Sequence, residues 1–199
     1  MSTRHPQILA LTADGTPHQW LHWQDAVTLK CKGLVSFEMG NEDQFLGGVS
    51  RMTGAQSHVE VGTIVSIKGK FKHSRKTPAL TNQNLFRRDL HTCSYCGKHF
   101  TESKLTRDHI HPVSRGGKDT WENCVAACWR CNNKKGAYTL DEAGLELLWV
   151  PYVPSRHEAL ILSNRHILAD QAEYIVGFLP KHSRAIQYLE NHCGIVIAS

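Results

Sequence analysis

Short apolar runs separated by glycine, asparagine and proline mark the first third of the chain. The run at 7–11 predicts a β-strand, and residues 23–32 predict a short helix that ends at Gly33. Residues 34–37 and 59–67 predict two further strands, because β-branched and aromatic residues are frequent there. This part of the chain therefore predicts a small α/β unit.

The stretches between these elements carry turn and loop signals. Residues 14–17 (DGTP) predict a tight turn. Residues 39–56 are rich in Gly, Asn and Asp, so we expect a loop there. Residues 68–76 predict a second loop, which is strongly basic and is closed by Pro78.

The middle of the chain predicts the order strand, loop, strand, helix. Residues 105–110 have an extended pattern that ends before Pro112. A flexible basic loop is expected at 114–118, and a second extended segment at 121–127. A helix is expected to begin at Asn132.

From Pro151 onward the pattern becomes helical. Ser155 and Glu158 have the spacing of a helix capping box. Pro180 interrupts the pattern, and residues 183–191 predict a final helix. Apolar residues before that proline recur at helical spacing, at Ile161, Leu162, Ile167, Leu168, Tyr174, Ile175 and Phe178.

The composition is ordinary for a soluble globular protein. The 199 residues are 41% hydrophobic and 21% charged, which is enough apolar material for a core. No apolar run reaches the roughly 18 residues that span a bilayer, and no secretory apolar stretch follows the N-terminus. We therefore expect a cytoplasmic protein without a membrane partner.

Positive charge is concentrated in the middle of the chain. Residues 68–138 contain 15 Lys/Arg and five Asp/Glu, a local charge of +10, whereas the rest of the chain carries −5. A concentration of this kind attracts polyanions and supplies phosphate affinity that does not depend on base sequence. The charge pattern therefore indicates a nucleic-acid partner.

Two CxxC pairs lie within this basic segment and bracket the tripeptide at 108–110: Cys93 with Cys96, and Cys128 with Cys131. Two short chelating turns that supply four thiolates suit a structural, tetrahedral zinc ion. A redox CxxC is the alternative for either pair alone, but two pairs and an odd total of seven cysteines favour metal binding. Cys124 lies in an apolar run and is expected to be buried rather than to bind metal.

Between the two pairs lie Asp108 and His109. An imidazole titrates near neutral pH, so His109 is the candidate general base that takes a proton from water. Asp108 and Asn132 offer hard oxygen ligands to a catalytic divalent cation, with Asn133 as the substitute for Asn132. Asn132 could equally be a helix N-cap. Adjacent strand residues point to opposite faces, so Asp108 and His109 can reach one phosphate only where the strand ends or bends.

These motifs resemble the HNH endonuclease family. The matching pieces cover about a quarter of the chain: CSYCG at 93–97, LTRDHIHPVSRGG at 105–117, WENCVAAC at 121–128 and CNNKKG at 131–136. The resemblance implies an α+β fold with a ββα-metal nuclease core stapled by the four-cysteine zinc site. It also implies Mg²⁺ or Mn²⁺ as the catalytic ion. Asn132 stands where the family name has its final His, which makes the chain an HNN variant.

The resemblance also assigns roles outside the metal ligands. Asn123 corresponds to the middle Asn of the family name, and its implied role is to bind the loop backbone and hold His109 in orientation. Lys134 and Lys135 are placed in the first turn of the expected helix, where a bound phosphate would compensate the helix dipole. Arg87 and Arg88 are further candidates for backbone contacts. The expected phosphate contacts are Arg107, Arg115, Lys118, Arg130, Lys134 and Lys135.

The predicted organisation is an N-terminal α/β segment at 1–84, an HNH nuclease core at 85–145 and a C-terminal helical extension at 146–199. We predict metal-dependent hydrolysis of DNA phosphodiester bonds, by nicking or cutting, with double-stranded DNA as partner. RNA as a substrate and homodimer formation stay open. The alternative is a noncatalytic, zinc-stapled nucleic-acid-binding module. The adjacent acid and histidine favour the enzyme, because a carboxylate repels phosphate unless a cation lies between them.

Overall fold

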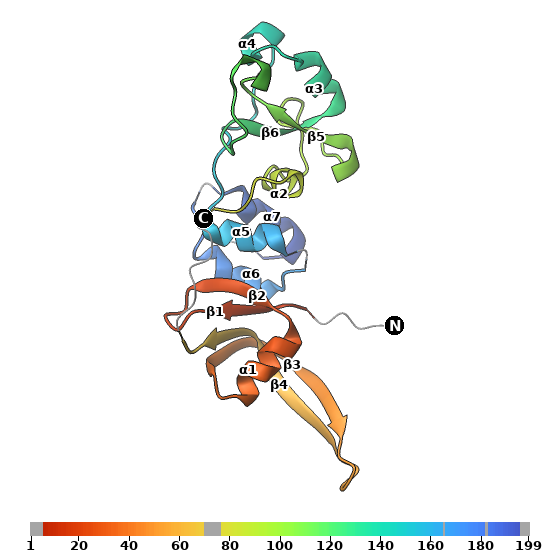
Figure 1. Cartoon of the computed structure of the whole chain (residues 1–199), viewed down its shortest axis with the longest axis vertical. Helices are drawn as coiled ribbons and strands as arrows, with labels where there is room; N and C mark the ends of the chain where they lie inside the picture. Colours follow the sequence, from red (N-terminus) through yellow and green to blue (C-terminus); the bar gives the residue numbers. More distant parts are fainter. Residues whose placement is uncertain (1–5, 70–76, 165, 182, 196–199) are drawn as a thin grey trace. The chain divides into compact units, whose positions relative to one another are not determined.

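The computed structural model describes residues 6–69, 77–164, 166–181 and 183–195 (Figure 1). They are grouped into two compact units. Unit 1 comprises residues 1–74, 164–180 and 189–199, and unit 2 comprises residues 75–163 and 181–188. Small sheets and short helices occur together in the described residues, so the predicted α+β class is confirmed. No helix among the described residues is long and apolar enough to cross a membrane.

Unit 1 is built on a four-stranded sheet with the strand order β2-β1-β4-β3. β1 (Ile8–Leu11) pairs antiparallel with β2 (Pro17–Leu21) and parallel with β4 (Gln56–Ile67). β3 (Val35–Val49) pairs antiparallel with β4 at the edge of the sheet. The predicted strands at 7–11, 34–37 and 59–67 all lie within this sheet, whereas β2 was not predicted.

Helix α1 (Trp23–Cys31) packs its apolar side chains on the sheet. The Trp23 ring stacks on Phe45 with a centroid distance of 4.9 Å. The predicted end of this helix is confirmed, because Gly33 follows it with a φ of 68°, a left-handed conformation that favours glycine. The buried core residues of unit 1 are Ile8, Ala10, Leu21, Ala26, Phe45, Val61, Val65 and Ile67.

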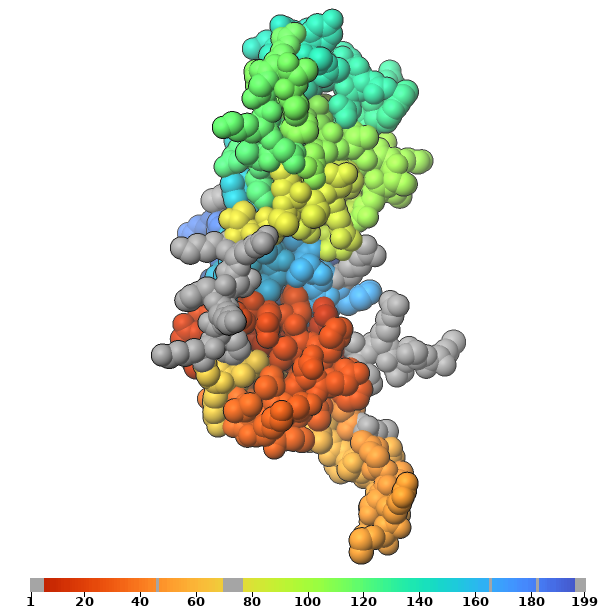
Figure 2. Space-filling view, in the orientation of Figure 1, coloured from red at the N-terminus to blue at the C-terminus, as the bar shows by residue number. Residues whose placement is uncertain are grey.

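The loop predicted at 39–56 is wrong, because most of this stretch belongs to a long hairpin. β3 continues to Val49 and β4 begins at Gln56, so that only the turn between them lacks strand structure. The outer part of the hairpin protrudes from unit 1 (Figures 1 and 2), and most of its side chains are exposed. Its polar composition therefore suggested a loop, whereas backbone pairing with β4 makes it a strand.

Helix α6 (Ala169–Val176) is joined to the sheet of unit 1 by a buried amide. The side-chain nitrogen of Gln171 donates to the carbonyl oxygens of Gln7 (2.8 Å) and Thr63 (2.9 Å). Gln171 is fully buried, so these bonds give its amide nitrogen the two partners that water cannot supply there. A segment far along the sequence thus completes the N-terminal sheet.

The C-terminal apolar pattern is divided between two helices, α5 (Arg156–Ser163) and α6, and is followed by α7 (Arg184–Cys193). The predicted capping box is confirmed: the amide of Glu158 donates to Ser155 Oγ (3.2 Å), and the amide of Ser155 donates to Glu158 Oε2 (2.6 Å). α7 begins in unit 2 and ends in unit 1. Of the predicted basic loop at 68–76, residues 70–76 lie outside the described residues.

Unit 2 contains the β5 (Leu105–His109) and β6 (Cys124–Cys128) hairpin, followed directly by α3 (Trp129–Lys135). Helix α2 (Asn82–Arg88), which was not predicted, packs on the hairpin. The buried residues between them are Leu85, Phe86, Leu105, Trp121, Cys124 and Ala126. Shorter elements complete the unit: the 3₁₀ turns η1 (Glu102–Lys104) and η2 (Val113–Arg115), and α4 (Leu140–Ala143).

A buried ion pair fastens α2 to β6. Arg88 binds the carboxylate of Asp89 and also donates to the carbonyl oxygens of Trp121 (2.7 Å) and Cys124 (2.8 Å). Asp89 in turn accepts from the amide of Ala126 (2.7 Å). Arg88 is only 2% exposed, so its candidate role as a phosphate contact is corrected. The guanidinium charge of Arg88 is compensated inside the protein by Asp89, because a buried charge needs a partner of opposite sign and its N–H groups need acceptors.

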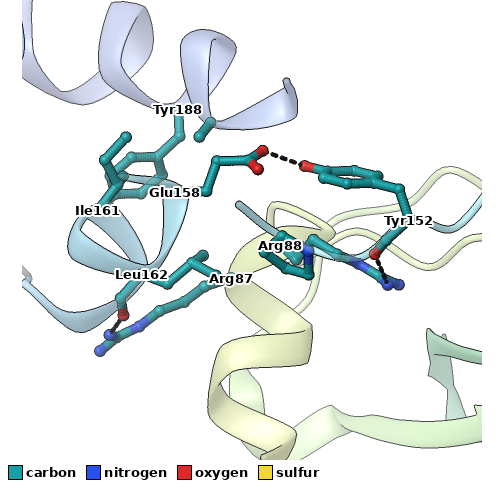
Figure 3. Close-up of a pocket in the computed structure, with 9 residues that line it drawn as sticks. Arg87, Arg88, Tyr152, Glu158, Ile161, Leu162 and Tyr188 are labelled. Atoms are coloured by element: carbon teal, nitrogen blue, oxygen red, sulfur yellow. Dashed lines mark hydrogen bonds between the residues drawn. The ribbon is translucent and has the colours of Figure 1, made fainter. Parts of the chain in front are cut away.

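Arg87 also serves the packing of unit 2. Its guanidinium donates to the carbonyl oxygen of Leu162 at the end of α5, and the two arginines lie with Tyr152 and Glu158 around a small cavity (Figure 3). The cavity measures about 10 Å³, which leaves room for at most one water molecule, so it is a packing gap and not a ligand site.

Candidate functional site

The candidate site is built on the hairpin β5–β6 and on α3. The predicted strand at 105–110 is confirmed by β5, which pairs from Leu105 opposite Cys128 to His109 opposite Cys124. The helix begins at Trp129, with Cys128 as its extended N-cap, and not at Asn132 as predicted. Lys134 and Lys135 therefore lie in its last turn, where the helix dipole favours cations, and their predicted place in the first turn is corrected.

The two CxxC pairs come together in space. The sulfur atoms of Cys93, Cys96, Cys128 and Cys131 all lie within 4.8 Å of one another. Tetrahedral zinc with Zn–S bonds of about 2.3 Å requires sulfur separations of about 3.8 Å, so the four thiols fit such an ion. The amide of Ser94 donates to Ala126 O (2.8 Å), which holds the first pair against β6.

The alternation of side chains along β5 divides the candidate catalytic residues between two faces. Thr106 and Asp108 face α3: the amide nitrogen of Asn132 donates to Thr106 Oγ1 (2.8 Å), and Lys135 Nζ donates to Asp108 Oδ1 (3.1 Å). Arg107 and His109 alternate with them and lie on the other face of the strand.

Asp108 is buried on the α3 face and has two hydrogen-bond partners there. Its side chain is 6% exposed and Lys135, its ion-pair partner, is 0% exposed. Lys135 also donates to His109 O (2.7 Å), and the hydroxyl of Tyr95 donates to the second carboxylate oxygen. Burial and the hydrogen bond to Asp108 hold the pKa of Tyr95 far above its ordinary value, so Tyr95 remains a donor.

The burial of Lys135 corrects its predicted contact with nucleic acid. A phosphate group cannot reach an ammonium that has no exposed surface and already serves Asp108 and the end of β5. The sequence suggested otherwise because Lys134 and Lys135 are adjacent and chemically alike. On a helix their side chains point about 100° apart, which buries Lys135 and leaves Lys134 in solvent.

On the opposite face, His109 has a partner that the sequence analysis missed. Its Nε2 lies 2.9 Å from Asp119 Oδ1, and Arg107 binds both oxygens of the same carboxylate at 2.7–2.8 Å. The hydrogen bond from Arg107, followed by that to His109, lowers the pKa of Asp119 to about 2. Asp119 is therefore an anion at neutral pH. The only sequence signal was an acid in the loop that returns from β5 to β6.

Cys124 completes this side of the site. It is fully buried, as expected, and its thiol lies 3.3 Å from Asp119 Oδ1. Burial, with the nearby Asp119 charge, raises the pKa of Cys124 to about 12. The ligand atoms of His109, Asp119 and Cys124 lie within 4.8 Å of one another, and the Asp119 carboxylate of this cluster already has the Arg107 guanidinium as its cationic partner.

Asn123 spans the loop that follows β5. Its Oδ1 accepts from the amide of His111 (2.8 Å), and its Nδ2 donates to the carbonyl oxygens of His111 (3.1 Å) and Lys118 (2.8 Å). The same loop is closed by Gly117, where a Cβ would lie 1.9 Å from His111 O. A side chain at this glycine is therefore excluded. The close approach to His111 and the hydrogen bonds of Asn123 together fix the backbone conformation of the loop after β5.

Asp108 and His109 meet at a cleft of about 210 Å³. β5 ends at His109, so the two faces of the strand open on one hollow there. The other lining residues come from the loop that begins at Pro112 and from the end of α3 with the two residues after it: Pro112, Val113, Ser114, Lys135, Gly136 and Ala137. The cleft is the place where a reacting group can approach both an imidazole and a carboxylate.

The remaining candidate phosphate contacts fall into two groups. Arg107 and Arg115 are engaged with acids, since Arg115 binds both oxygens of Glu142 at 2.7–2.9 Å. Lys118, Arg130 and Lys134 are exposed on the surface. The structure thus leaves these last three available to a polyanion, whereas the two arginines would have to exchange partners.

Comparison with known proteins finds matches for the segment that contains the site. Residues 93–137 match the family model described as HNH endonuclease. Over 45 residues the chain is 49% identical to the CRISPR-associated endonuclease Cas9 of Corynebacterium diphtheriae (strain ATCC 700971 / NCTC 13129 / Biotype gravis), a match that covers 22% of this chain and 4% of that Cas9. The chain thus corresponds to a small part of that relative. The predicted resemblance to the HNH endonuclease family is confirmed for this segment.

The different surroundings of two neighbouring lysines give a direct test of the site. Lys135→Met leaves the Asp108 carboxylate buried without its partner, and we expect the free energy of unfolding of unit 2 to fall by about 3–5 kcal/mol. The matched variant Lys134→Met removes an exposed charge and should change this free energy by less than about 0.5 kcal/mol. Hydrogen exchange of the β5 amides measures both. An equal loss of stability in the two variants would contradict the assignment of Lys135 and Asp108 as a buried ion pair.

Proposed function

We propose that this chain, which carries an HNH endonuclease domain at residues 93–137, is a metal-dependent endonuclease that hydrolyses DNA phosphodiester bonds. The observation that carries the proposal is the cleft at the end of β5, where Asp108 and His109 open on one hollow beside a four-cysteine cluster. The surrounding segment of +10 charge supports a polyanionic substrate.

In the proposed mechanism His109 is the general base and Asp119 is its positioning residue. The hydrogen bond from Nε2 to the Asp119 anion places the imidazole proton on Nε2 and leaves the lone pair on Nδ1. Nδ1 then takes a proton from the attacking water, and Asp119 stabilises the imidazolium that forms. Asn123 holds the loop beside His109 and preserves this orientation.

Asp108 and Asn132 are the proposed ligands of Mg²⁺ or Mn²⁺, with Asn133 as the substitute for Asn132. Their chemistry fits: the Asn132 amide nitrogen is committed to Thr106, which leaves its oxygen as the ligand atom. A carboxylate has about four lone-pair sites, so Asp108 can accept from Lys135 and Tyr95 and still bind a cation. When bound, the ion neutralises phosphoryl oxygens and stabilises the departing oxygen.

The four cysteines are proposed to hold a structural Zn²⁺. Their positions support a structural role, because the cluster connects the segment before β5 to the end of β6 and the first turn of α3. The rival function is a noncatalytic nucleic-acid-binding module. The acid and histidine at the cleft favour the enzyme, since a binding surface gains nothing from a carboxylate near phosphate.

Loss of the general base tests the central claim. His109→Ala should reduce Mg²⁺-dependent plasmid nicking by roughly 10²- to 10⁴-fold, because water then loses its proton acceptor. Mg²⁺ should be added to zinc-loaded protein free of Mg²⁺, since a chelator would also remove the structural ion. The exposed His99 provides the matched control, and His99→Ala should retain nicking. Nicking that survives in His109→Ala would refute the assignment.

Asp119 is tested by removing its charge. Asp119→Asn should lower kcat by roughly 10- to 100-fold with little change in KM, because the imidazole loses its orienting anion while the substrate contacts remain. Asp119→Glu should recover part of the rate. Glu122→Gln, an exposed acid in the same loop, serves as the control. A change confined to KM would show that Asp119 acts on binding and not through His109.

Elemental analysis tests the structural ion. We expect one zinc per chain, measured by mass spectrometry of the purified protein, and a marked loss of zinc in Cys131→Ser because one of four thiolates is removed. Cys31→Ser replaces an exposed cysteine of unit 1 and should keep the full zinc content. Equal zinc content in both variants would contradict the four-cysteine site.

A further inference from the structure

A second and larger hollow lies in unit 2 beside the four-cysteine cluster. Its volume is about 780 Å³, and its walls come from η1, β5, α3 and three of the four cysteines: Cys96, Cys128 and Cys131. The hollow is distinct from the cleft at the end of β5, with which it shares no lining residue. We call it the cysteine-side groove. It has room for a ligand of the size of a nucleotide.

The charge of the cysteine-side groove favours an anion. Four basic side chains line it and no Asp or Glu does: Lys98, Lys104, Arg130 and Lys134. Four thiolates around a Zn²⁺ ion would carry a formal charge of −2. The basic side chains exceed that by two positive charges, so the groove attracts phosphate groups even with the ion bound.

An exposed tryptophan gives the groove an aromatic surface. Trp129 lines it and is 68% exposed, an unusual position for the largest apolar side chain. It is the first residue of α3, directly after Cys128, and Cys131 lies on the same helical turn. The cluster therefore fixes the backbone on both sides of Trp129. An exposed indole beside cations, on a backbone held at both sides, is an arrangement on which a nucleic-acid base can stack.

The groove leads toward the proposed catalytic cleft. Thr106 lines the groove and lies on the same face of β5 as Asp108, two residues and about 7 Å away along the strand. Tyr95 also lines the groove, and its hydroxyl donates to Asp108. A polynucleotide strand bound in the groove would therefore place a neighbouring phosphate near the cleft.

We infer that the cysteine-side groove binds a single-stranded stretch of the DNA substrate, with one base stacked on Trp129 and the adjoining phosphates held by the four basic side chains. The inference rests on the proposed function and specifies its substrate class, a DNA with an unpaired strand next to the bond that is cut. Inside a duplex each base face is covered by its neighbours, so the indole can stack only on an unpaired base.

The test is a binding measurement without cleavage. Fluorescence anisotropy follows zinc-loaded, Mg²⁺-free protein with three labelled probes: a short single-stranded DNA, an abasic strand of equal length and a blunt duplex. The native protein should bind the single strand more tightly than the abasic strand or the duplex. Trp129→Ala should weaken single-strand binding by roughly 5- to 150-fold, the loss of one stacked base, and leave abasic binding unchanged.

Two further variants make the result specific. Trp129→Phe keeps an aromatic surface and should retain most of the single-strand affinity, whereas Val150→Ala truncates an 84% exposed side chain outside the groove and should have no effect. Unchanged single-strand affinity in Trp129→Ala, or an equal loss with the abasic strand, overturns the inference. Plasmid nicking by the native protein after addition of Mg²⁺ is measured in a separate assay. Its absence alongside Trp129-dependent binding refutes the proposed function and leaves the groove assignment in place.

Discussion

The alternation of side chains along one short strand arranges the whole candidate site. Neighbouring residues of a β-strand point to opposite faces, so β5 sends Asp108 toward α3 and His109 toward Asp119. Each side chain meets its own partners and is held independently of the other. The strand ends at His109, and only there do the two faces open on the same cleft. Ending the strand at this residue places a carboxylate and an imidazole at one hollow.

The sequence predicted the parts of the fold and of the site that depend on local pattern. The CxxC spacing, the strand around Asp108 and the helix termini at Gly33 and Ser155 follow from short-range chemistry, and the structure contains them. Asp119 could not be found in this way, since no periodicity shows which loop carboxylate folds back on β5. The β3–β4 hairpin was missed for the opposite reason. Most side chains of its outer part are exposed, so the composition there is that of a loop although the backbone is paired.

Positive charge in unit 2 has two different uses. Some cations of the basic segment are engaged with acids or carbonyl groups inside the unit and stabilise it: Arg88, Arg107, Arg115 and Lys135. Others line the cysteine-side groove: Lys98, Lys104, Arg130 and Lys134. A local charge of +10 therefore overstates the surface offered to a polyanion. Burial, which the sequence does not reveal, decides which cations remain for binding.

The buried amide of Gln171 has a consequence for the order in which the protein can be completed during synthesis. The strands of unit 1 are synthesised before unit 2. The residue that donates to the carbonyl groups of Gln7 and Thr63 follows each of them by more than a hundred positions. All of residues 75–163, the main part of unit 2, are made in between. The N-terminal sheet is thus begun early and completed late, so the growing chain carries an incomplete sheet while the segment that matches the HNH endonuclease model is synthesised.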